Sequence, residues 1–465
     1  MIYNNALFRK GVAIGSICAL FCSVHPVAAQ QAPTKTQSST EKKPETAPWE
    51  WFGITGQVTA TLQSLFPFHS PYEGANSLPS RAETEISHTY TLYLGARLSQ
   101  NLEAYLDPEM ARGKGIGEAL GLAGFTNGDV IRNPTLGEAP YLGRYFGRWT
   151  ISTQPGREKV EKGDNVLAGM RPTHRIVITG GKFGSNDIFD TNSYANSTRT
   201  QFMNWSLLNA AAYDYAADTR GYTQGVSVEW VHPDWALRLG SFQMPTVSNG
   251  TDLAGDLVHS RGDQIEIELH PLLLKTSGST IVRLLAYRNL AAMGNYRAAL
   301  QQGLSAGTIP DITAVRRKGA VKYGFEINFE QPLCDNGDTG VFGRYAFNEG
   351  RTETFAYTEA DRSLSLGVQV SGKRWRCSRD HVGIAYAQND LSSPHKEYLE
   401  AGGQGFILGD GRLNYAPEQI LEAYYTFGVS RLVGLSLDYQ FIAHPGYNQD
   451  RGPVSVVSLR LHLAF

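Results

Sequence analysis

Apolar and polar residues alternate along many short stretches of the chain. In "DQIEIELH" (263–270), Ile265, Ile267 and Leu269 alternate with polar residues, and "VSVVSLRLHLAF" (454–465) at the C-terminus has the same period. A period of two is that of a β-strand with one apolar and one polar face. The stretches that predict strands are 54–66, 89–99, 101–110, 140–154, 175–185, 221–232, 235–246, 263–274, 279–290, 321–333, 339–349, 363–373, 380–391, 418–429, 432–443 and 454–465.

The connections between these sixteen predicted strands alternate between short and long. Examples of long ones are 111–139, 186–220 and 392–417, and the one longer connection on the short side is the polar segment 155–174. A soluble sandwich would not sort its connections by length. The alternation of short and long connections predicts an all-β fold, a transmembrane, antiparallel, up-and-down barrel of 16 strands. In such a barrel the turns are short on the periplasmic side and the loops long on the extracellular side, the apolar side of the wall faces lipid, and the lumen is polar. A barrel of this size encloses a water-filled channel.

Residues 186–220 are too apolar for a freely solvated loop. Their aromatic residues, among them Phe189, Phe202 and Trp205, need cover. We therefore expect this loop to fold into the barrel and narrow it, with a short helix within 200–216. An external cap or a contact with a partner is the alternative. The glycine-rich loop 111–139 is expected to assist in the lumen.

The two ends of the chain predict export to the outer membrane of a Gram-negative bacterium. Residues 1–29 have the charged start, short apolar run and small residues of a signal peptide. Residues 30–50 have the composition of a disordered periplasmic leader, which leaves 51–465 for the barrel. After the signal peptide no apolar run is long enough for a membrane helix. The terminal aromatic residue, Phe465, is expected to be the signal for the barrel assembly machinery.

Charge and cysteine content narrow the possible functions. The formal net charge is −2, which gives no reason to expect nucleic acid as a partner. Two cysteines remain after the signal peptide, Cys334 and Cys377. Both fall on predicted periplasmic turns, so a disulfide between them is one hypothesis and two unpaired rim cysteines are the other.

The alternation also predicts which charged residues line the channel, because every second residue of a barrel strand faces the lumen. We call this rule strand parity. The predicted channel-lining residues are Arg97, Glu103, Asp107, Arg144, Arg148, Glu229, Arg238, Glu266, Arg283, Glu326, Arg344, Asp438 and Arg460. Further inward positions carry Lys322, Glu109, Glu268, Glu330 and Glu422, so basic and acidic groups are nearly balanced. Such a lumen favours a neutral, hydroxyl-rich solute over an ion of one sign. The alternative for each residue is that it only solvates the wall and pairs with a neighbour.

Motifs that suggest catalysis lack the setting that their chemistry requires. "GLSAG" (303–307) matches the G-x-S-x-G pattern around Ser305, but it falls in a loop and not on a strand–turn–helix elbow. The histidines form no H-E-x-x-H motif or Cys/His cluster. We therefore expect no catalytic residue, no metal and no cofactor.

Four stretches together resemble one known family. "FHSPYEGANSL" (68–78), "LGLAGFTNGDVIRN" (120–133), "DGRLNYAPEQILEAYY" (410–425) and "DYQFIAHPGYNQDRGPVSV" (438–456) are similar to the bacterial carbohydrate-selective porins, the OprB-like porins. The resemblance runs from about Trp51 to Phe465. It implies a sixteen-stranded outer-membrane barrel through which carbohydrates, mono- or small oligosaccharides, diffuse.

The expected partners are therefore carbohydrate solutes and outer-membrane lipid. The sequence does not distinguish a monomer from a homotrimer. The alternatives are a porin for another small solute, such as an organic acid or anion, and an outer-membrane lipid hydrolase.

Overall fold

The computed structural model describes residues 50–130, 137–272, 276 and 278–465. The predicted signal peptide and leader lie outside the described residues, apart from Glu50 at the leader's end. The barrel begins at Phe52, close to the predicted boundary at residue 51.

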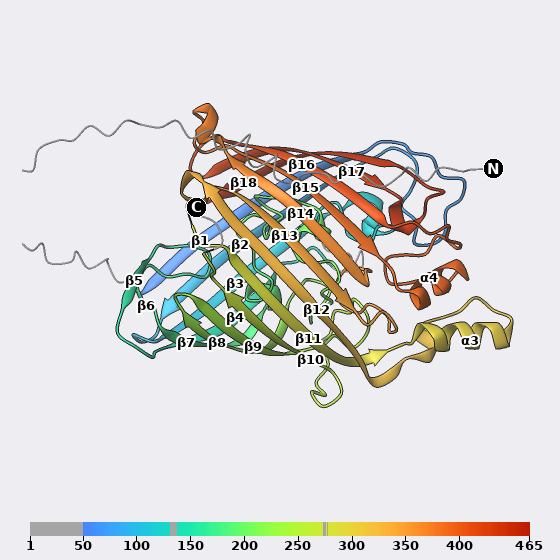
Figure 1. Cartoon of the computed structure of the whole chain (residues 1–465), viewed down its shortest axis with the longest axis horizontal. Helices are drawn as coiled ribbons and strands as arrows, with labels where there is room; N and C mark the ends of the chain where they lie inside the picture. The colour runs from blue at the N-terminus through green and yellow to red at the C-terminus, as the bar shows by residue number, and fades with distance from the viewer. Residues whose placement is uncertain (1–49, 131–136, 273–275, 277) are drawn as a thin grey trace, which may run out of the picture. The chain divides into compact units, whose positions relative to one another are not determined.

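Sixteen strands form one closed barrel in which each strand pairs antiparallel with its neighbour, and β18 pairs with β1 to close it (Figure 1). This confirms the predicted barrel and its strand count. The barrel strands are β1 (Phe52–Leu65), β2 (Glu83–Arg97), β3 (Leu102–Gly113), β4 (Tyr141–Ser152), β7 (Arg175–Phe183), β8 (Thr223–His232), β9 (Trp235–Gln243), β10 (Arg261–Leu269), β11 (Ile281–Met293), β12 (Arg317–Cys334), β13 (Thr339–Asn348), β14 (Arg362–Ser371), β15 (His381–Asp390), β16 (Glu418–Gly428), β17 (Val433–Ala443) and β18 (Val454–Ala464).

The remaining elements lie in the connections. β5 (Arg157–Val160) and β6 (Gly169–Pro172) form a separate hairpin between β4 and β7. The α-helices are α2 (Trp205–Leu208), α3 (Tyr296–Ala306) and α4 (Ser393–Glu400). Short 3₁₀ turns are η1 (Ile116–Ala119), η2 (Ser185–Asp187), η3 (Thr313–Val315), η4 (Asp335–Gly337), η5 (Gly372–Trp375) and η6 (Pro445–Tyr447). Within the described part of the chain, every helix is too short or too polar to cross a bilayer.

The connections sort by length between the two ends of the barrel. We call the end with brief connections, such as 233–234 and 429–432, the short-turn rim, and the opposite end the long-loop rim. The β5–β6 hairpin and both ends of the barrel chain lie at the short-turn rim, on the left in Figure 1, and α3 and α4 lie at the long-loop rim, on the right. At the short-turn rim, Phe465 exchanges two backbone hydrogen bonds of 3.0 Å with Gly56.

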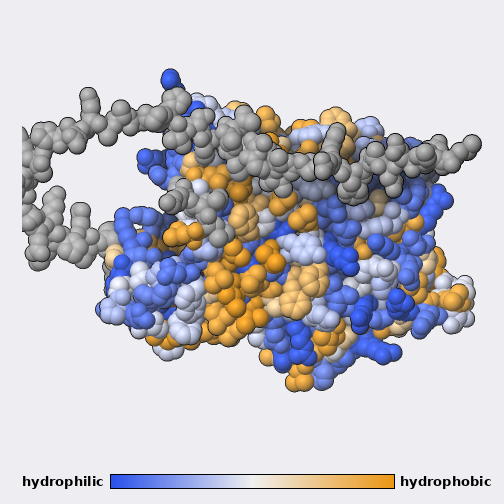
Figure 2. Space-filling model, viewed as in Figure 1, coloured by the Kyte–Doolittle hydropathy of each residue, from blue (hydrophilic) through white to orange (hydrophobic). Residues whose placement is uncertain are grey.

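Side-chain exposure separates the two faces of the wall. On β17, Leu437 is 50% exposed and its neighbour Asp438 is 3% exposed. On β10, Ile267 is 41% exposed and Glu266 is 0% exposed. Figure 2 shows hydrophobic residues gathered across the middle of the barrel, between hydrophilic ends. The apolar positions therefore face outward and the polar positions face inward, which is the arrangement expected of a membrane-spanning barrel.

Two long connections fill much of the interior. In the connection 184–222, the apolar residues Phe189, Phe202 and Tyr213 are fully buried. In the other, 114–130, the carbonyl of Thr126 accepts hydrogen bonds from Gln63 (3.1 Å) and Gln440 (2.7 Å) on the inner wall. The barrel is thus a wall around packed loops that leave defined cavities.

The helix expected within 200–216 is shorter than predicted and covers only α2. Asn204 caps its start by accepting a hydrogen bond from the amide of Ser206. Beyond α2, the amide of Ala210 donates to Asp190 (2.8 Å) and that of Ala212 donates to Ser363 on the wall (3.1 Å). These side-chain acceptors replace the helical carbonyls, so the backbone leaves the helix without losing its hydrogen bonds.

Candidate functional site

A cavity of about 420 Å³ lies inside the barrel between the wall and the two inward connections. Its wall residues come from β1 to β4 and β18. Most of the others come from 114–130, 184–222 and the loop before β14, and Asp164 of the β5–β6 hairpin and Asn249 of the connection between β9 and β10 complete the lining. This volume is in the range of small-molecule sites in proteins. The lining includes Gln57, Thr89, Tyr93, Glu109, Asp129, Tyr141, Arg144, Asp164, Asp187, Thr198, Arg199, Trp205, Tyr215, Asp218, Arg220, Tyr222, Tyr357 and His462.

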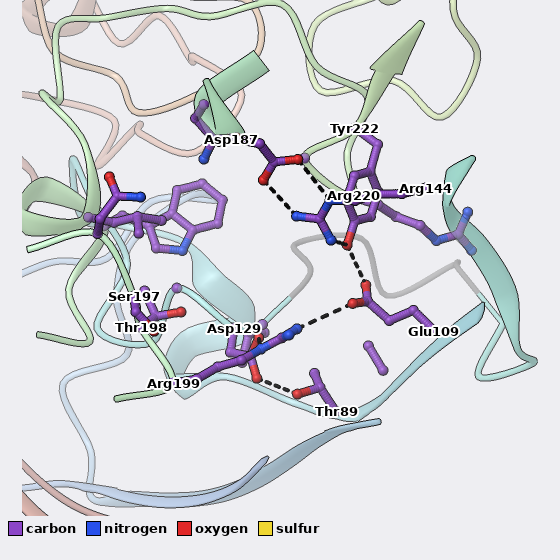
Figure 3. A pocket seen from close by; sticks show the side chains of 18 of the residues that line it. Thr89, Glu109, Asp129, Arg144, Asp187, Ser197, Thr198, Arg199, Arg220 and Tyr222 are labelled. Atoms are coloured by element: carbon purple, nitrogen blue, oxygen red, sulfur yellow. Dashed lines mark hydrogen bonds and ion pairs between the residues drawn. The ribbon is translucent and has the colours of Figure 1, made fainter. Parts of the chain in front are cut away.

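A continuous chain of polar contacts crosses this cavity (Figure 3). At one end, Arg144 of β4 donates two hydrogen bonds of 2.7 Å to the carboxylate of Asp187. Arg144 also donates to the Tyr222 hydroxyl (3.5 Å), which in turn donates to Glu109 of β3 (2.8 Å).

The chain continues through Arg199, which forms ion pairs with Glu109 (3.3 Å) and Asp129 (2.8 Å). Thr89 of β2 then donates to Asp129. Both inward connections are thereby held to β2, β3 and β4, and each charged group has a partner of opposite sign. Pairing of this kind holds these side chains in fixed positions along the cavity.

Burial raises the pKa of two cavity residues that lie outside the strands. Burial raises the pKa of the Asp218 carboxyl, and the ammonium of Lys182, at 3.4 Å, opposes that shift. Burial and the nearby Glu109 carboxylate raise the pKa of Tyr222 well above its usual value. The Tyr222 phenol therefore keeps its proton and acts as a hydrogen-bond donor to Glu109.

Aromatic rings form another part of the lining. Trp205 and Tyr357 are stacked, with ring centroids 5.3 Å apart and planes inclined by 18°. The ring centroid of Tyr215 lies 4.7 Å from that of Tyr357. Among the described residues, the Trp205 indole nitrogen has no hydrogen-bond partner, although it is buried. The cavity thus combines ring faces with an indole donor that is not used within the described chain.

A second cavity of about 290 Å³ lies closer to the short-turn rim. Asp187 lines both cavities, so the two adjoin at the Arg144–Asp187 pair. Six of the predicted site residues border a cavity: Arg144 borders the larger, and Arg97, Glu103, Arg148, Glu229 and Arg238 border the smaller.

The other seven predicted site residues border neither of these two cavities. They are Asp107, Glu266, Arg283, Glu326, Arg344, Asp438 and Arg460. All seven are buried on the inner wall. Five of them contact the connection 184–222 or form ion pairs along the wall, Asp107 lies under the β5–β6 hairpin, and Asp438 accepts a hydrogen bond from Gln440 (3.3 Å).

Arg344 and Arg460 are the main anchors of the connection 184–222. Arg344 pairs with Asp190 at 2.7 Å and donates to the carbonyls of Leu207 (3.0 Å) and Ala195 (2.8 Å). Arg460 donates to two further carbonyls of the same connection, at 2.6 and 2.7 Å. These arginines therefore hold the segment that bounds the larger cavity.

Residues that strand parity did not select complete the cavity. Arg199, Asp187, Asp218 and Tyr222 belong to the connection 184–222, and Asp129 to 114–130. The aromatic content of 186–220 predicted an inward fold, but a connection has no period that tells which polar side chains face the cavity.

The proposed disulfide between Cys334 and Cys377 is absent from the structure, where the two sulfur atoms are not bridged. The two turns do touch, as predicted, because Lys373 pairs with Asp338 at 2.5 Å. However, Arg374 donates a hydrogen bond to the Cys334 sulfur at 2.7 Å.

Comparison with known proteins places this barrel in a family. The model of the carbohydrate-selective porin, OprB family, matches residues 78–465. A comparison with curated proteins found no match.

Among solved structures, the high-pH structure of Pseudomonas putida OprB is similar, with a TM-score of 0.66 and 15% sequence identity. That alignment covers 89% of this chain and 94% of that chain, and supports the fold. An anion-selective porin from Comamonas acidovorans aligns at a TM-score of 0.47 and 11% identity, over 89% of this chain and 99% of that chain.

The closed barrel, its polar lumen and a family match over most of its length lead to one conclusion: the chain belongs to the carbohydrate-selective porin family, the OprB family, and is an outer-membrane carbohydrate porin.

Proposed function

We propose that small sugars, mono- or small oligosaccharides, diffuse through the two adjoining cavities and pass the Arg144–Asp187 pair on the way. In this proposal the long-loop rim is extracellular and the short-turn rim periplasmic. The six predicted residues that border a cavity line the path. The buried predicted residues act on it indirectly, by holding the connection 184–222 in place.

The observation that carries this proposal is the mixed lining of the larger cavity. A sugar ring has weakly polar faces, which pack on aromatic rings, and an edge of hydroxyls, which need donors and acceptors. Of the two stacked rings, Trp205 is partly exposed and offers apolar ring surface to a sugar, whereas Tyr357 is 1% exposed and supports it from behind. The polar chain from Asp187 to Asp129 offers both donors and acceptors.

The charge of this cavity does not favour anions. Three arginines line it, against five carboxylates: Arg144, Arg199 and Arg220 against Glu109, Asp129, Asp164, Asp187 and Asp218. A lumen selective for anions would carry an excess of basic groups. We therefore expect neutral sugars to permeate faster than organic acids of similar size in a liposome-swelling series.

Replacing Trp205 by alanine is expected to weaken binding of glucose in the lumen by about threefold to tenfold, because one aromatic contact is worth roughly 1 kcal/mol. The measurement is the concentration of glucose that blocks half of the ion current through single channels. Trp205→Phe keeps a ring and should recover most of the affinity. Trp230→Ala removes a tryptophan that is half exposed on the outer wall and is the control. Equal affinities for the alanine variants at 205 and 230 would contradict the proposed binding surface.

Deleting Phe465 is expected to lower the yield of assembled barrel in outer membranes, because this residue closes the seam. Its ring lies over Gly56, where an added Cβ would come within 2.4 Å of it. The proposed partner at this end is the barrel assembly machinery. Phe465→Tyr, which keeps an aromatic ring, is the control, and the measurement is the fraction of protein that resists denaturation without heating. A normal yield from the deletion would argue against this role.

We also propose that the chain has no hydrolytic activity. Ser305 of the G-x-S-x-G match lies in the last turn of α3, and its hydroxyl donates to the carbonyl of Gln301 (2.8 Å). This is an ordinary helical contact of a serine and not an arrangement with a base. Purified protein should release no fatty acid from phospholipid vesicles, and release that is lost in Ser305→Ala would refute this.

A further inference from the structure

The connection between β4 and β7 is unlike the other connections at the short-turn rim. It carries the β5–β6 hairpin, whose tip comprises residues 161–168. The tip ends in a tight turn in which Gly163 and Val166 exchange two backbone hydrogen bonds of 3.1 Å. Asn165 adopts a left-handed conformation there, with φ at 53°, which asparagine tolerates better than most residues. The tip is therefore a defined turn.

The tip is bound to the inner wall by four neighbouring strands. Arg148 of β4 donates to the carbonyl of Asn165 (2.9 Å), and the Asn165 amide donates to Asp107 of β3 (2.7 Å). Arg97 of β2 donates to the carbonyl of Ala168 (3.2 Å).

On β1, the Thr55 hydroxyl donates to Asp164 (3.0 Å). All four of these wall residues belong to the inward face. The tip thus reaches into the barrel and does not extend from the rim into solvent.

The wall also holds a socket for one apolar side chain of the tip. Gly53 and Gly95 face each other across β1 and β2. A Cβ built on Gly53 would lie 2.7 Å from the Leu167 side chain, and one on Gly95 would lie 3.2 Å from it. Leu167 is only 4% exposed and belongs to one hydrophobic cluster with Tyr105. Glycine at both wall positions therefore leaves the space that Leu167 fills.

We propose that this tip is a second constriction of the channel, in series with the connection 184–222, and that Asp164 lines the path of the solute. Asp164 borders the larger cavity, and Val166 and Leu167 border the smaller one. The tip thus adjoins both cavities. Because the two constrictions are in series, the resistance of the tip adds to that of the connection 184–222 for a solute that diffuses in either direction. The inference rests on the proposed path through the two cavities.

The first test places a cysteine at Asp164 and measures the current through single channels in potassium chloride. The background carries Cys334→Ser and Cys377→Ser, so the new thiol is the only one in the mature chain. Modification of Asp164→Cys with a bulky, charged methanethiosulfonate is expected to lower the conductance by about half or more, because the adduct enters the narrow path. Lys159→Cys, on β5 of the same hairpin, is the matched control. Lys159 is exposed and pairs only with Glu161 in the described structure, so its modification should leave the conductance unchanged.

The second test shortens the hairpin. Val160 and Gly169 are already paired, so a two-residue Asn-Gly turn can replace residues 161–168. The conductance of this variant is expected to rise by about twofold, and larger sugars should swell liposomes faster. Unchanged conductance in the shortened variant, or equal effects of modification at positions 159 and 164, would overturn the proposal. Because ion current is measured without sugar, a channel that responds at the tip but passes no sugar would refute the proposed function and leave the second constriction standing.

Discussion

Replacing Arg344 by alanine is expected to destabilise the folded barrel by about 3–5 kcal/mol, because it leaves the Asp190 carboxylate buried without its counter-charge. Both side chains are almost fully buried, and the 2.7 Å ion pair joins β13 to the connection 184–222. Arg344 also binds two carbonyls of that connection, which lose a donor in the variant. The connection should leave the wall more often, so conductance should rise and fluctuate between levels. The measurements are urea unfolding in detergent and single-channel recording.

The double variant Arg344→Ala/Asp190→Asn separates charge from anchoring. It removes the orphaned carboxylate, so part of the stability should return. The anchor is still missing, so the raised conductance should persist. Arg288→Ala removes an arginine that is exposed on the outside of β11 and should change neither quantity by much. Wild-type conductance in Arg344→Ala would mean that the connection does not depend on this pair.

The barrel itself could be predicted from the sequence because the same two-residue period is repeated in every strand. A one-residue slip would turn an apolar row such as Leu435, Leu437 and Tyr439 into the lumen, so the pattern specifies both the strand and its register. Errors in strand boundaries do not change that outcome. The family resemblance added the solute class, which periodicity alone cannot supply.

The candidate site could be predicted only in part, because parity tells which side of the wall a residue faces and not what covers it. Glu266 faces inward as predicted, but it is fully buried by Arg238 and the backbone of Asp190. Whether such a residue meets a solute depends on where the connection 184–222 lies. That position follows from contacts between residues far apart in the chain, such as Arg460 with the carbonyl of Thr198.

The packing of the β5–β6 hairpin could not be predicted from the sequence either. Most of the connection 155–174 is polar, as in a solvated turn, and the short apolar run Val166–Ala168 does not by itself predict where Leu167 packs. The socket for Leu167 exists only once β1 and β2 are paired and bring Gly53 opposite Gly95. Neither the sequence of the hairpin nor that of β1 and β2, taken alone, predicts that Leu167 packs against these two glycines.

Placing arginine at Leu437 is expected to cost about 2–4 kcal/mol of folding free energy, because the guanidinium must enter hydrocarbon near the middle of the membrane. Leu437 lies on the outer face of β17, between Tyr425 of β16 and Leu459 of β18, and half of its surface is exposed. No acidic side chain is directly opposite it on either neighbouring strand, so a cross-strand ion pair cannot offset the cost. The measurements are the yield of assembled barrel and the midpoint of urea unfolding in lipid vesicles.

Leu432→Arg is the matched control for the depth of the substituted residue in the membrane. It lies in the turn before β17 at the short-turn rim and is 55% exposed, so it is the same residue type at a similar exposure. Arginine there can reach water and the lipid headgroups, and the expected cost falls to about 0–1 kcal/mol. The comparison tests the membrane boundary as well as the outward orientation, because a soluble barrel would tolerate both substitutions alike. Equal yields and midpoints for Leu437→Arg and Leu432→Arg would place the centre of β17 outside the hydrocarbon.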